Sequence, residues 1–144
     1  MTVRTAIGLL GGAKALGVPS GLAVQWERMV CEGVPVRSAD ALREAIDVPD
    51  AVLAQLLGVS EMILWRVRAI NGRLSPAASL RLLRAARIVA LAFEVLESEQ
   101  DAVRWLMHPQ AGLGVRAPLA LLATDAGRDL VEKMLLQIGH SVSA

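Results

Sequence analysis

The stretch from Asp50 to Gly72 constrains the fold most, because it has the pattern of two short helices joined by a tight turn. The sequence Gly58-Val59-Ser60 interrupts the pattern, where glycine allows a sharp turn and serine can cap the following helix. This is the spacing of a helix-turn-helix, which places its second helix in the major groove of DNA. The apolar positions expected to pack inward are Leu53, Ala54, Leu56 and Leu57 in the first helix and Ile63, Leu64 and Val67 in the second.

The charge of the following segment favours contact with DNA. Between Ser60 and Phe93 the only acidic residue is Glu61, and the net charge is +5 in a chain whose total is +1. A local basic excess is expected of a surface that meets phosphates. The alternative is an ordinary helical corner in an all-α core with a solvated charged face. The basic residues are all arginines, which suit bidentate contacts: Arg66, Arg68, Arg73, Arg81, Arg84 and Arg87.

Helical geometry selects the outward positions of the second helix. We expect Arg66 to contact a base or a phosphate, and Arg68 and Arg73 to contact phosphates. Trp65 either lies against the sugar–phosphate backbone or serves as an aromatic residue of the core or of a dimer interface. The expected DNA-binding residues are Ser60, Met62, Trp65, Arg66, Arg68 and Arg73.

The composition predicts an all-α protein. Alanine and leucine dominate a chain of 144 residues that is 54% hydrophobic, and no segment shows the alternation of a strand. The single cysteine, Cys31, excludes an internal disulfide and is expected to be a small buried thiol. Polar residues such as Lys14 interrupt the apolar stretch 6–26, which is therefore too short to span a membrane. We expect a cytoplasmic protein without a membrane partner.

Capping residues predict where two further helices begin. Ser38 is expected to cap a helix that runs through Ile46. Ser75 followed by Pro76 is expected to open a long helix whose apolar stripe continues to Leu96.

Similar signals predict the carboxy-terminal helices. An acidic run from 94 to 101 is expected to begin a helix that stops before Pro109, and Pro118 is expected to open a short one. Thr124 is expected to cap the last helix, and Gly139 is expected to end it. Its predicted inner face consists of Leu130, Val131, Met134, Leu135 and Ile138.

The sequence shows no arrangement of residues typical of catalysis or of metal binding. There is no glycine-rich phosphate loop between a strand and a helix. The two histidines, His108 and His140, are 32 residues apart with no cysteine pair nearby, which argues against a zinc site. We therefore expect no enzyme, no catalytic residues, no metal and no cofactor, and we expect His108 to bond carbonyls at the end of its helix.

The carboxy-terminal stretch from Ala102 to Val142 closely resembles the toxin-binding domain of the Xre/MbcA/ParS antitoxins. The stretch from Leu57 to Ser79 is similar to the Xre-like helix-turn-helix of the same family. Ile63 stands where the family often has threonine, so part of the DNA-contact set departs from the family pattern. The carboxy-terminal signature consists of Trp105-Leu106, Pro109, Leu113-Gly114, Pro118-Leu119, Leu121-Leu122, Thr124, Gly127, Val131, Leu135 and Ile138.

This resemblance implies a type II antitoxin. Its partner would be a RES-domain toxin that consumes NAD, and the antitoxin tail would obstruct the active site of the toxin. The helix-turn-helix would bind operator DNA and repress the shared promoter, with a homodimer matching a palindromic site. The expected toxin-binding residues are His140, Ser141, Val142, Ser143, Ala144, Trp105 and Arg116.

We divide the chain into three parts on this basis. Residues 1–47 form a helical amino-terminal segment with a candidate role in dimerisation, 48–96 the Xre-like helix-turn-helix domain, and 97–144 the toxin-binding domain. From Glu94 onward the net charge is −3, which suits a protein partner better than phosphates. Two alternatives stay open: a stand-alone helix-turn-helix regulator without a toxin, and a purely structural helical interaction domain.

Overall fold

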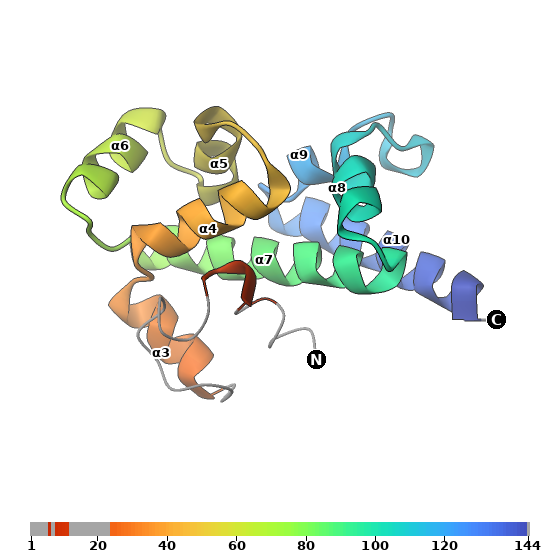
Figure 1. Ribbon diagram of the computed structural model, residues 1–144, viewed down its shortest axis with the longest axis horizontal. Coiled ribbons are helices and arrows are strands. Elements are labelled where there is room, and N and C mark those ends of the chain that lie inside the picture. Colours follow the sequence, from red (N-terminus) through yellow and green to blue (C-terminus); the bar gives the residue numbers. More distant parts are fainter. Residues whose placement is uncertain (1–5, 7, 12–23, 144) are drawn as a thin grey trace.

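A computed structural model describes residues 6, 8–11 and 24–143, and it is all-α over these residues (Figure 1). None of the helices in this part of the chain is long and apolar enough to cross a membrane. The helices are α3 (Val24–Glu32), α4 (Val36–Ile46), α5 (Asp50–Leu57), α6 (Glu61–Ala69), α7 (Pro76–Leu96), α8 (Glu99–Met107), the short 3₁₀ turn η1 (Ala111–Leu113), α9 (Pro118–Leu121) and α10 (Asp125–Ser143).

The long helix α7 is the centre of the fold. Figure 1 shows it running beneath α4 and α5 at one end, with α6 above and beyond its start, and alongside α8 and α10 at the other. Its predicted start is confirmed, because the backbone N–H of Ala78 donates to Ser75 Oγ (3.2 Å) and Pro76 is the first helical residue. Small buried residues such as Ala85 and Ala86 let neighbouring helices approach closely from more than one side.

The predicted helix-turn-helix is confirmed in α5 and α6. Gly58 adopts a left-handed conformation (φ 70°) at the end of α5, and the backbone N–H of Ile63 donates to Ser60 Oγ (3.1 Å) at the start of α6. Leu64 is fully buried, but Ile63 is 47% exposed, so its predicted inward position is wrong. The reason is that α4 and α5 cover one narrow side of α6, and Ile63 lies outside it.

Two expectations in the amino-terminal half are wrong. Ser38 does not cap α4, because that helix begins at Val36, whose N–H donates to the carbonyl of Gly72 (3.0 Å) and needs no side-chain cap. Cys31 is exposed. It lies two residues after the buried Met29, so the helical twist turns it away from the core.

The carboxy-terminal helix is longer than predicted. The Thr124 cap is confirmed, since the N–H of Gly127 donates to Thr124 Oγ1 (3.0 Å). Gly139, however, does not end α10, which continues through Ser143. A Cβ added at Gly139 would meet Val95 of α7 at ordinary contact distance, and Ser141 Oγ donates to the Gln137 carbonyl (3.1 Å) one turn earlier in the helix.

The predicted inner face of α10 holds in part. Val131 and Leu135 are fully buried, and Met134 packs partly buried against the core. Leu130 is 47% exposed, because it points about 100° away from Val131 around the helix. Of the predicted tail, Ala144 lies outside the described residues.

Candidate functional surfaces

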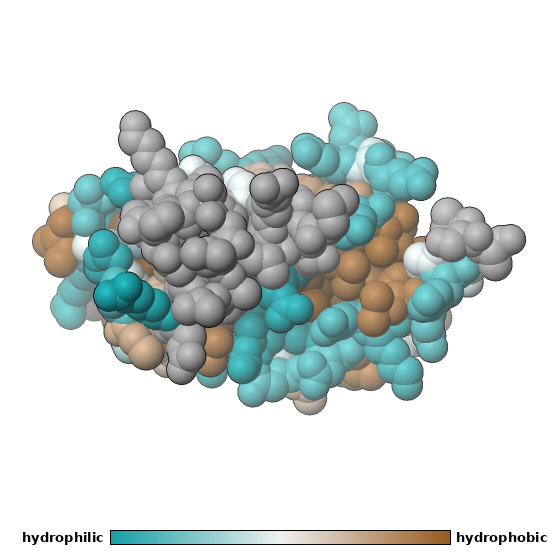
Figure 2. Space-filling view, turned by 90° about the horizontal axis from the view of Figure 1, so that it is seen from below, coloured by the Kyte–Doolittle hydropathy of each residue, from teal (hydrophilic) through white to brown (hydrophobic). Residues whose placement is uncertain are grey.

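The outer side of α6 is mostly apolar. Met62 is 61% exposed and Trp65 is 66% exposed, and Arg66 is exposed between Trp65 and the end of the helix. Figure 2 shows hydrophobic residues at the surface of the end of the molecule where Figure 1 places α6. The structure therefore brings Met62, Trp65 and Arg66 together on one exposed surface, with Ser60 occupied as the cap at its start.

Arg68 has a different environment from Arg66, because two carboxylates hold its guanidinium. Its Nη2 lies 2.7 Å from Asp40 Oδ1 of α4, and its Nη1 lies 3.0 Å from Asp50 Oδ2 of α5. Arg43 approaches Asp50 as well, with Nε 3.6 Å from Oδ1. We call Asp40, Arg43, Asp50 and Arg68 the ion cluster; it ties α6 to both preceding helices.

The charges of the ion cluster reinforce one another. The hydrogen bond from Arg68 lowers the pKa of Asp50, and burial of the carboxyl opposes this only in part. The pKa of Arg68 is raised by its hydrogen bonds to Asp50 and then to Asp40. Helical spacing gave no sign of this cluster, because the partners lie 18 and 28 residues from Arg68 in sequence. A phosphate contact by the same side chain stays a prediction.

Arg73 also has a partner within the chain. Its Nη1 donates to the carbonyl of Gly33 (2.7 Å), and its backbone pairs with Pro35. Gly33 has φ +86°, and a Cβ there would collide with the carbonyl of Leu74, so only glycine fits this crossing. Hydrogen bonds therefore join the segment after α6, which contains Arg73, to the segment before α4, which contains Gly33 and Pro35.

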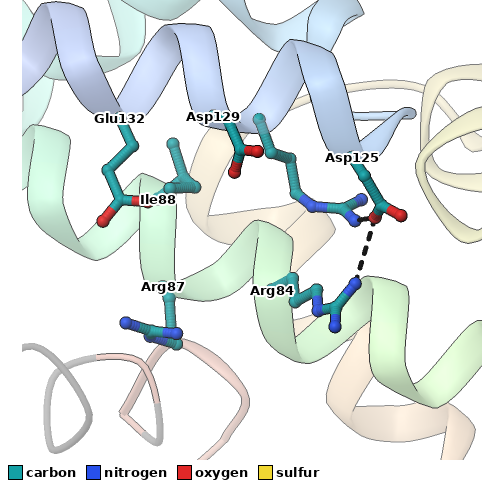
Figure 3. Close-up of a pocket in the computed structure, with 7 residues that line it drawn as sticks. Arg84, Arg87, Ile88, Asp125, Asp129 and Glu132 are labelled. Carbon is teal, nitrogen blue, oxygen red and sulfur yellow. Dashed lines mark hydrogen bonds and ion pairs between the residues drawn. The ribbon is translucent and has the colours of Figure 1, made fainter.

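The remaining arginines of the basic segment lie on α7. The guanidinium of Arg81 lies against Gly58, at the turn between α5 and α6. Arg84 and Arg87 instead line a cavity of about 400 Å³ between α7 and α10 (Figure 3). The basic excess seen in the sequence is therefore divided between the helix-turn-helix and the contact with α10.

A buried arginine closes the α10 side of this cavity. Arg128 is 5% exposed, pairs with Asp125 and donates from Nη1 to the carbonyl of Leu122 (3.1 Å). Burial lowers the pKa of Arg128, and the nearby Arg84 and Arg81 lower it further. Asp125 also pairs with Arg84 (3.0 Å), so one carboxylate joins α7 to α10.

The carboxy-terminal half brings Trp105 and Arg116 into one corner. Gln110 links them, since its Nε2 donates to the carbonyl of Trp105 (3.4 Å) and its backbone N–H donates to that of Arg116 (3.1 Å). Trp105 is half-buried and Arg116 is exposed. His108 Nδ1 lies 2.8 Å from the carbonyl of Arg104, which confirms its expected contact at the end of α8.

The helix α10 connects this corner to the predicted inhibitory tail. The corner's 3₁₀ turn packs on α10, where a Cβ at Gly112 would collide with Met134. His140 and Ser141 are exposed on the same helix, and His140 lies about 9 Å beyond Met134 along its axis. The predicted toxin-binding residues thus form two separate patches joined by one rigid element.

These features define a two-part helical protein of the helix-turn-helix class: a helix-turn-helix whose last long helix also carries a small second helical domain. A family model described as the antitoxin Xre-like helix-turn-helix domain matches residues 25–87. A model for the antitoxin Xre/MbcA/ParS carboxy-terminal toxin-binding domain matches residues 91–140. The chain belongs to the Xre/MbcA/ParS family of antitoxins.

Curated relatives agree with this assignment. The chain is 26% identical over 130 residues to an antitoxin Xre of Yersinia enterocolitica, which covers 90% of this chain and 88% of the relative. It is 41% identical over 60 residues to an antitoxin Xre of Pseudomonas putida, which covers 42% of this chain and 38% of that protein.

The comparisons confirm the predicted family and the all-α, two-domain fold. They indicate an antitoxin with a toxin as partner, and the helix-turn-helix suggests a regulator with DNA as the second partner. The helix-turn-helix match begins at residue 25 and so includes α4 and all but the first residue of α3. The boundaries 1–47, 48–96 and 97–144 stay a prediction.

Proposed function

We propose that this antitoxin neutralises a RES-domain toxin that consumes NAD, and that it represses its own operon as a homodimer. This proposal rests on the match of residues 91–140 to a toxin-binding domain. That domain follows the helix-turn-helix directly, and the two share the helix α7. The resemblance through Trp105-Leu106 and the following signature supports a RES-domain enzyme as the particular partner.

The end of α10 is the proposed inhibitory segment. Figure 1 shows this end of the helix projecting beyond α8. Its backbone is already hydrogen-bonded within the helix, so entering a cleft in the toxin costs little additional ordering. His140 and Ser141 are exposed there, and Trp105 and Arg116 supply a second contact nearer the core.

The test is co-expression of the tagged chain with the protein encoded by the neighbouring reading frame. We expect an enzyme to co-purify, to be silent in the complex, and to consume NAD after separation. Deleting residues 140–144 should restore NAD consumption while leaving DNA binding unchanged. Gln100→Ala, at an exposed position of α8, is the matched control and should inhibit normally.

Two outcomes would contradict the toxin-binding part. A truncated chain that still silences the enzyme would exclude the tail as the inhibitory segment. A tagged chain that recovers no enzyme, yet binds DNA, would leave a stand-alone transcriptional regulator.

The DNA-binding part makes a separate prediction. Arg66→Ala removes one exposed side chain that can contact a base or a phosphate, so it should weaken binding to operator DNA, and binding by the parent chain should fall as the salt concentration rises. Arg104→Ala, an exposed arginine of α8, should leave the affinity unchanged. Fluorescence anisotropy over a range of salt concentrations measures the affinity, and light scattering measures the proposed dimer. An unchanged affinity for Arg66→Ala would remove that residue from the DNA-binding set.

A further inference from the structure

We propose that α6 recognises its operator chiefly through the 5-methyl groups of thymine, with Arg66 as the one hydrogen-bonding reader on the helix. This inference rests on the proposed DNA binding and specifies the chemistry that the bound sequence must present. It follows from which side chains α6 exposes.

The exposed surface of α6 offers very little hydrogen-bonding capacity. Arg66 and Glu61 are its only exposed polar residues, and the helix has no asparagine, glutamine, serine or threonine. In the major groove, asparagine or glutamine reads adenine and arginine reads guanine, whereas apolar side chains contact the thymine methyl group. The exposed apolar side chains of α6 are Met62 (61%), Ile63 (47%) and Trp65 (66%), together with the small Ala69.

The spacing of these residues matches a groove-facing stripe. Met62, Trp65, Arg66 and Ala69 follow one another at intervals of one helical turn or less, so they share one side of α6. From Met62 to Ala69 the stripe is about 10 Å long. That length spans about three base-pair steps of B-DNA, which rise 3.4 Å each.

The surrounding charges favour DNA over a second copy of the chain as the occupant. Arg66 lies within the apolar stripe, and the guanidinium of Arg81 lies beside Gly58, just before α6. Two copies of this surface would bring their arginines together, whereas the phosphates that border the major groove complement them. Glu61 lies in the first turn of the helix, where the positive end of the helix dipole accommodates its charge.

Met62 and Trp65 are large apolar side chains that are each more than 60% exposed. Such exposure is expected where a binding partner removes the side chains from water. Burying one methyl group contributes about a fourfold change in affinity. The 5-methyl group is present in thymine and absent from uracil, so replacing thymine with deoxyuridine removes only that contact. Base pairing and the hydrogen-bonding edges stay the same.

The experiment begins by selecting DNA with the full-length chain from a random duplex library of about 25 base pairs, long enough for two half-sites. The selected duplex is then synthesised with deoxyuridine in place of individual thymines. We expect a loss of about fourfold at each contacted thymine. Met62→Ala and Trp65→Ala should each abolish the sensitivity at their own thymines.

Two variants separate this effect from general weakening. Arg66→Ala should weaken binding to the thymine and the deoxyuridine duplexes by the same factor. Leu130→Ala, at an apolar and similarly exposed position on α10, should change the affinity for neither the thymine nor the deoxyuridine duplex.

Three outcomes would overturn the inference. Equal affinity for thymine and deoxyuridine duplexes would exclude methyl recognition while leaving the proposed DNA binding intact. If the chain binds no duplex even at low salt, both the methyl recognition and the proposed DNA binding are contradicted. If Met62→Ala and Trp65→Ala bind the selected DNA normally but lose self-association, the patch belongs to a second copy of the chain.

Discussion

The helices α6 and α10 carry the two proposed binding surfaces, yet the fold holds them in different ways. Leu64 is the only buried residue of α6, and the ion cluster around Arg68 ties that helix to α4 and α5. In contrast, α10 is fixed by fully buried apolar residues such as Val131 and Leu135. The comparison shows that a short helix with little buried surface depends on polar links, whereas a long helix is positioned by its core face.

The two modes of attachment respond differently to solution conditions. Half-exposed ion pairs weaken with salt and with protonation of their carboxylates. Burial of apolar surface depends on neither to a comparable degree. We therefore expect α6 to loosen at low pH under conditions that leave α10 in place, and the following substitutions test this difference.

The largest expected effect is in the core face of α10. Leu135→Ala leaves a cavity at a fully buried position, so the free energy of unfolding should fall by about 2–5 kcal/mol. Urea denaturation followed by circular dichroism measures it. Leu130→Ala, on the exposed side of the same helix, should change the free energy by about 0.5 kcal/mol or less. Similar losses for the two variants would refute the assignment of the core face.

The next effect concerns a backbone crossing at the start of α10. A Cβ at Gly127 would collide with the carbonyl of Leu121, which is backbone and cannot move aside cheaply. Gly127→Ala should therefore lower the free energy of unfolding by about 1–3 kcal/mol, as other overpacked sites do. Thermal and urea unfolding measure this loss, and a variant as stable as the parent chain would show that the crossing has room.

The ion cluster gives a smaller effect that depends on pH. Arg68→Ala should cost about 1 kcal/mol at neutral pH, since the pairs are partly exposed. The folded pKa of Asp50 lies below its ordinary value of 3.8, so the cluster stabilises the fold above about pH 4. That stabilisation is lost as the pH falls through the folded pKa. The unfolding free energy of Arg68→Ala should therefore decline less between pH 5 and about pH 2.

The control for this prediction is an exposed pair on α8. Arg104 lies 3.9 Å from Asp101, and both side chains are more than 60% exposed. Arg104→Ala should retain the pH dependence of the parent chain. If Arg68→Ala and Arg104→Ala follow the same pH profile, the ion cluster does not contribute to the stability of α6.

The smallest effect tests the length of α10. Gly139 lies inside a helix, and a Cβ added there would lie 3.5 Å from Val95 Cγ2, which is ordinary van der Waals contact, so a methyl group fits. Gly139→Ala should raise the free energy of unfolding by about 0.5–1 kcal/mol by favouring the helical conformation. A loss of stability at this position would instead indicate that the helix ends at Gly139, as the sequence pattern suggested.

Local chemistry explains why much of the fold was predictable. The caps at Ser60, Ser75 and Thr124 were confirmed because each depends only on residues three positions away. The prediction for Ser38 was wrong because α4 starts at Val36, whose N–H donates to the carbonyl of Gly72. Gly72 follows the helix-turn-helix and is distant in sequence, so local spacing could not reveal this contact. The prediction that Gly139 ends α10 was wrong because the helix still packs beside Val95 of α7 at this position. Glycine often ends a helix, but here the helix continues through it.

The candidate surfaces were less predictable for the same reason. The exposed Met62, Trp65 and Arg66 follow from helical spacing alone. The links of Arg68 to Asp40 and Asp50, and of Arg84 to Asp125, join residues far apart in sequence. A count of charges along the chain treats all these arginines alike, whereas the tertiary structure pairs Arg68 and Arg84 with carboxylates of other helices.

The continuity of α7 has a consequence for how such antitoxins diversify. The two family models meet between residues 87 and 91, and Ile88, Val89 and Ala90 at that junction are all buried. A recombination event there would join halves of α7 that had evolved against different neighbours. Crossovers that exchange toxin specificity should therefore avoid this junction.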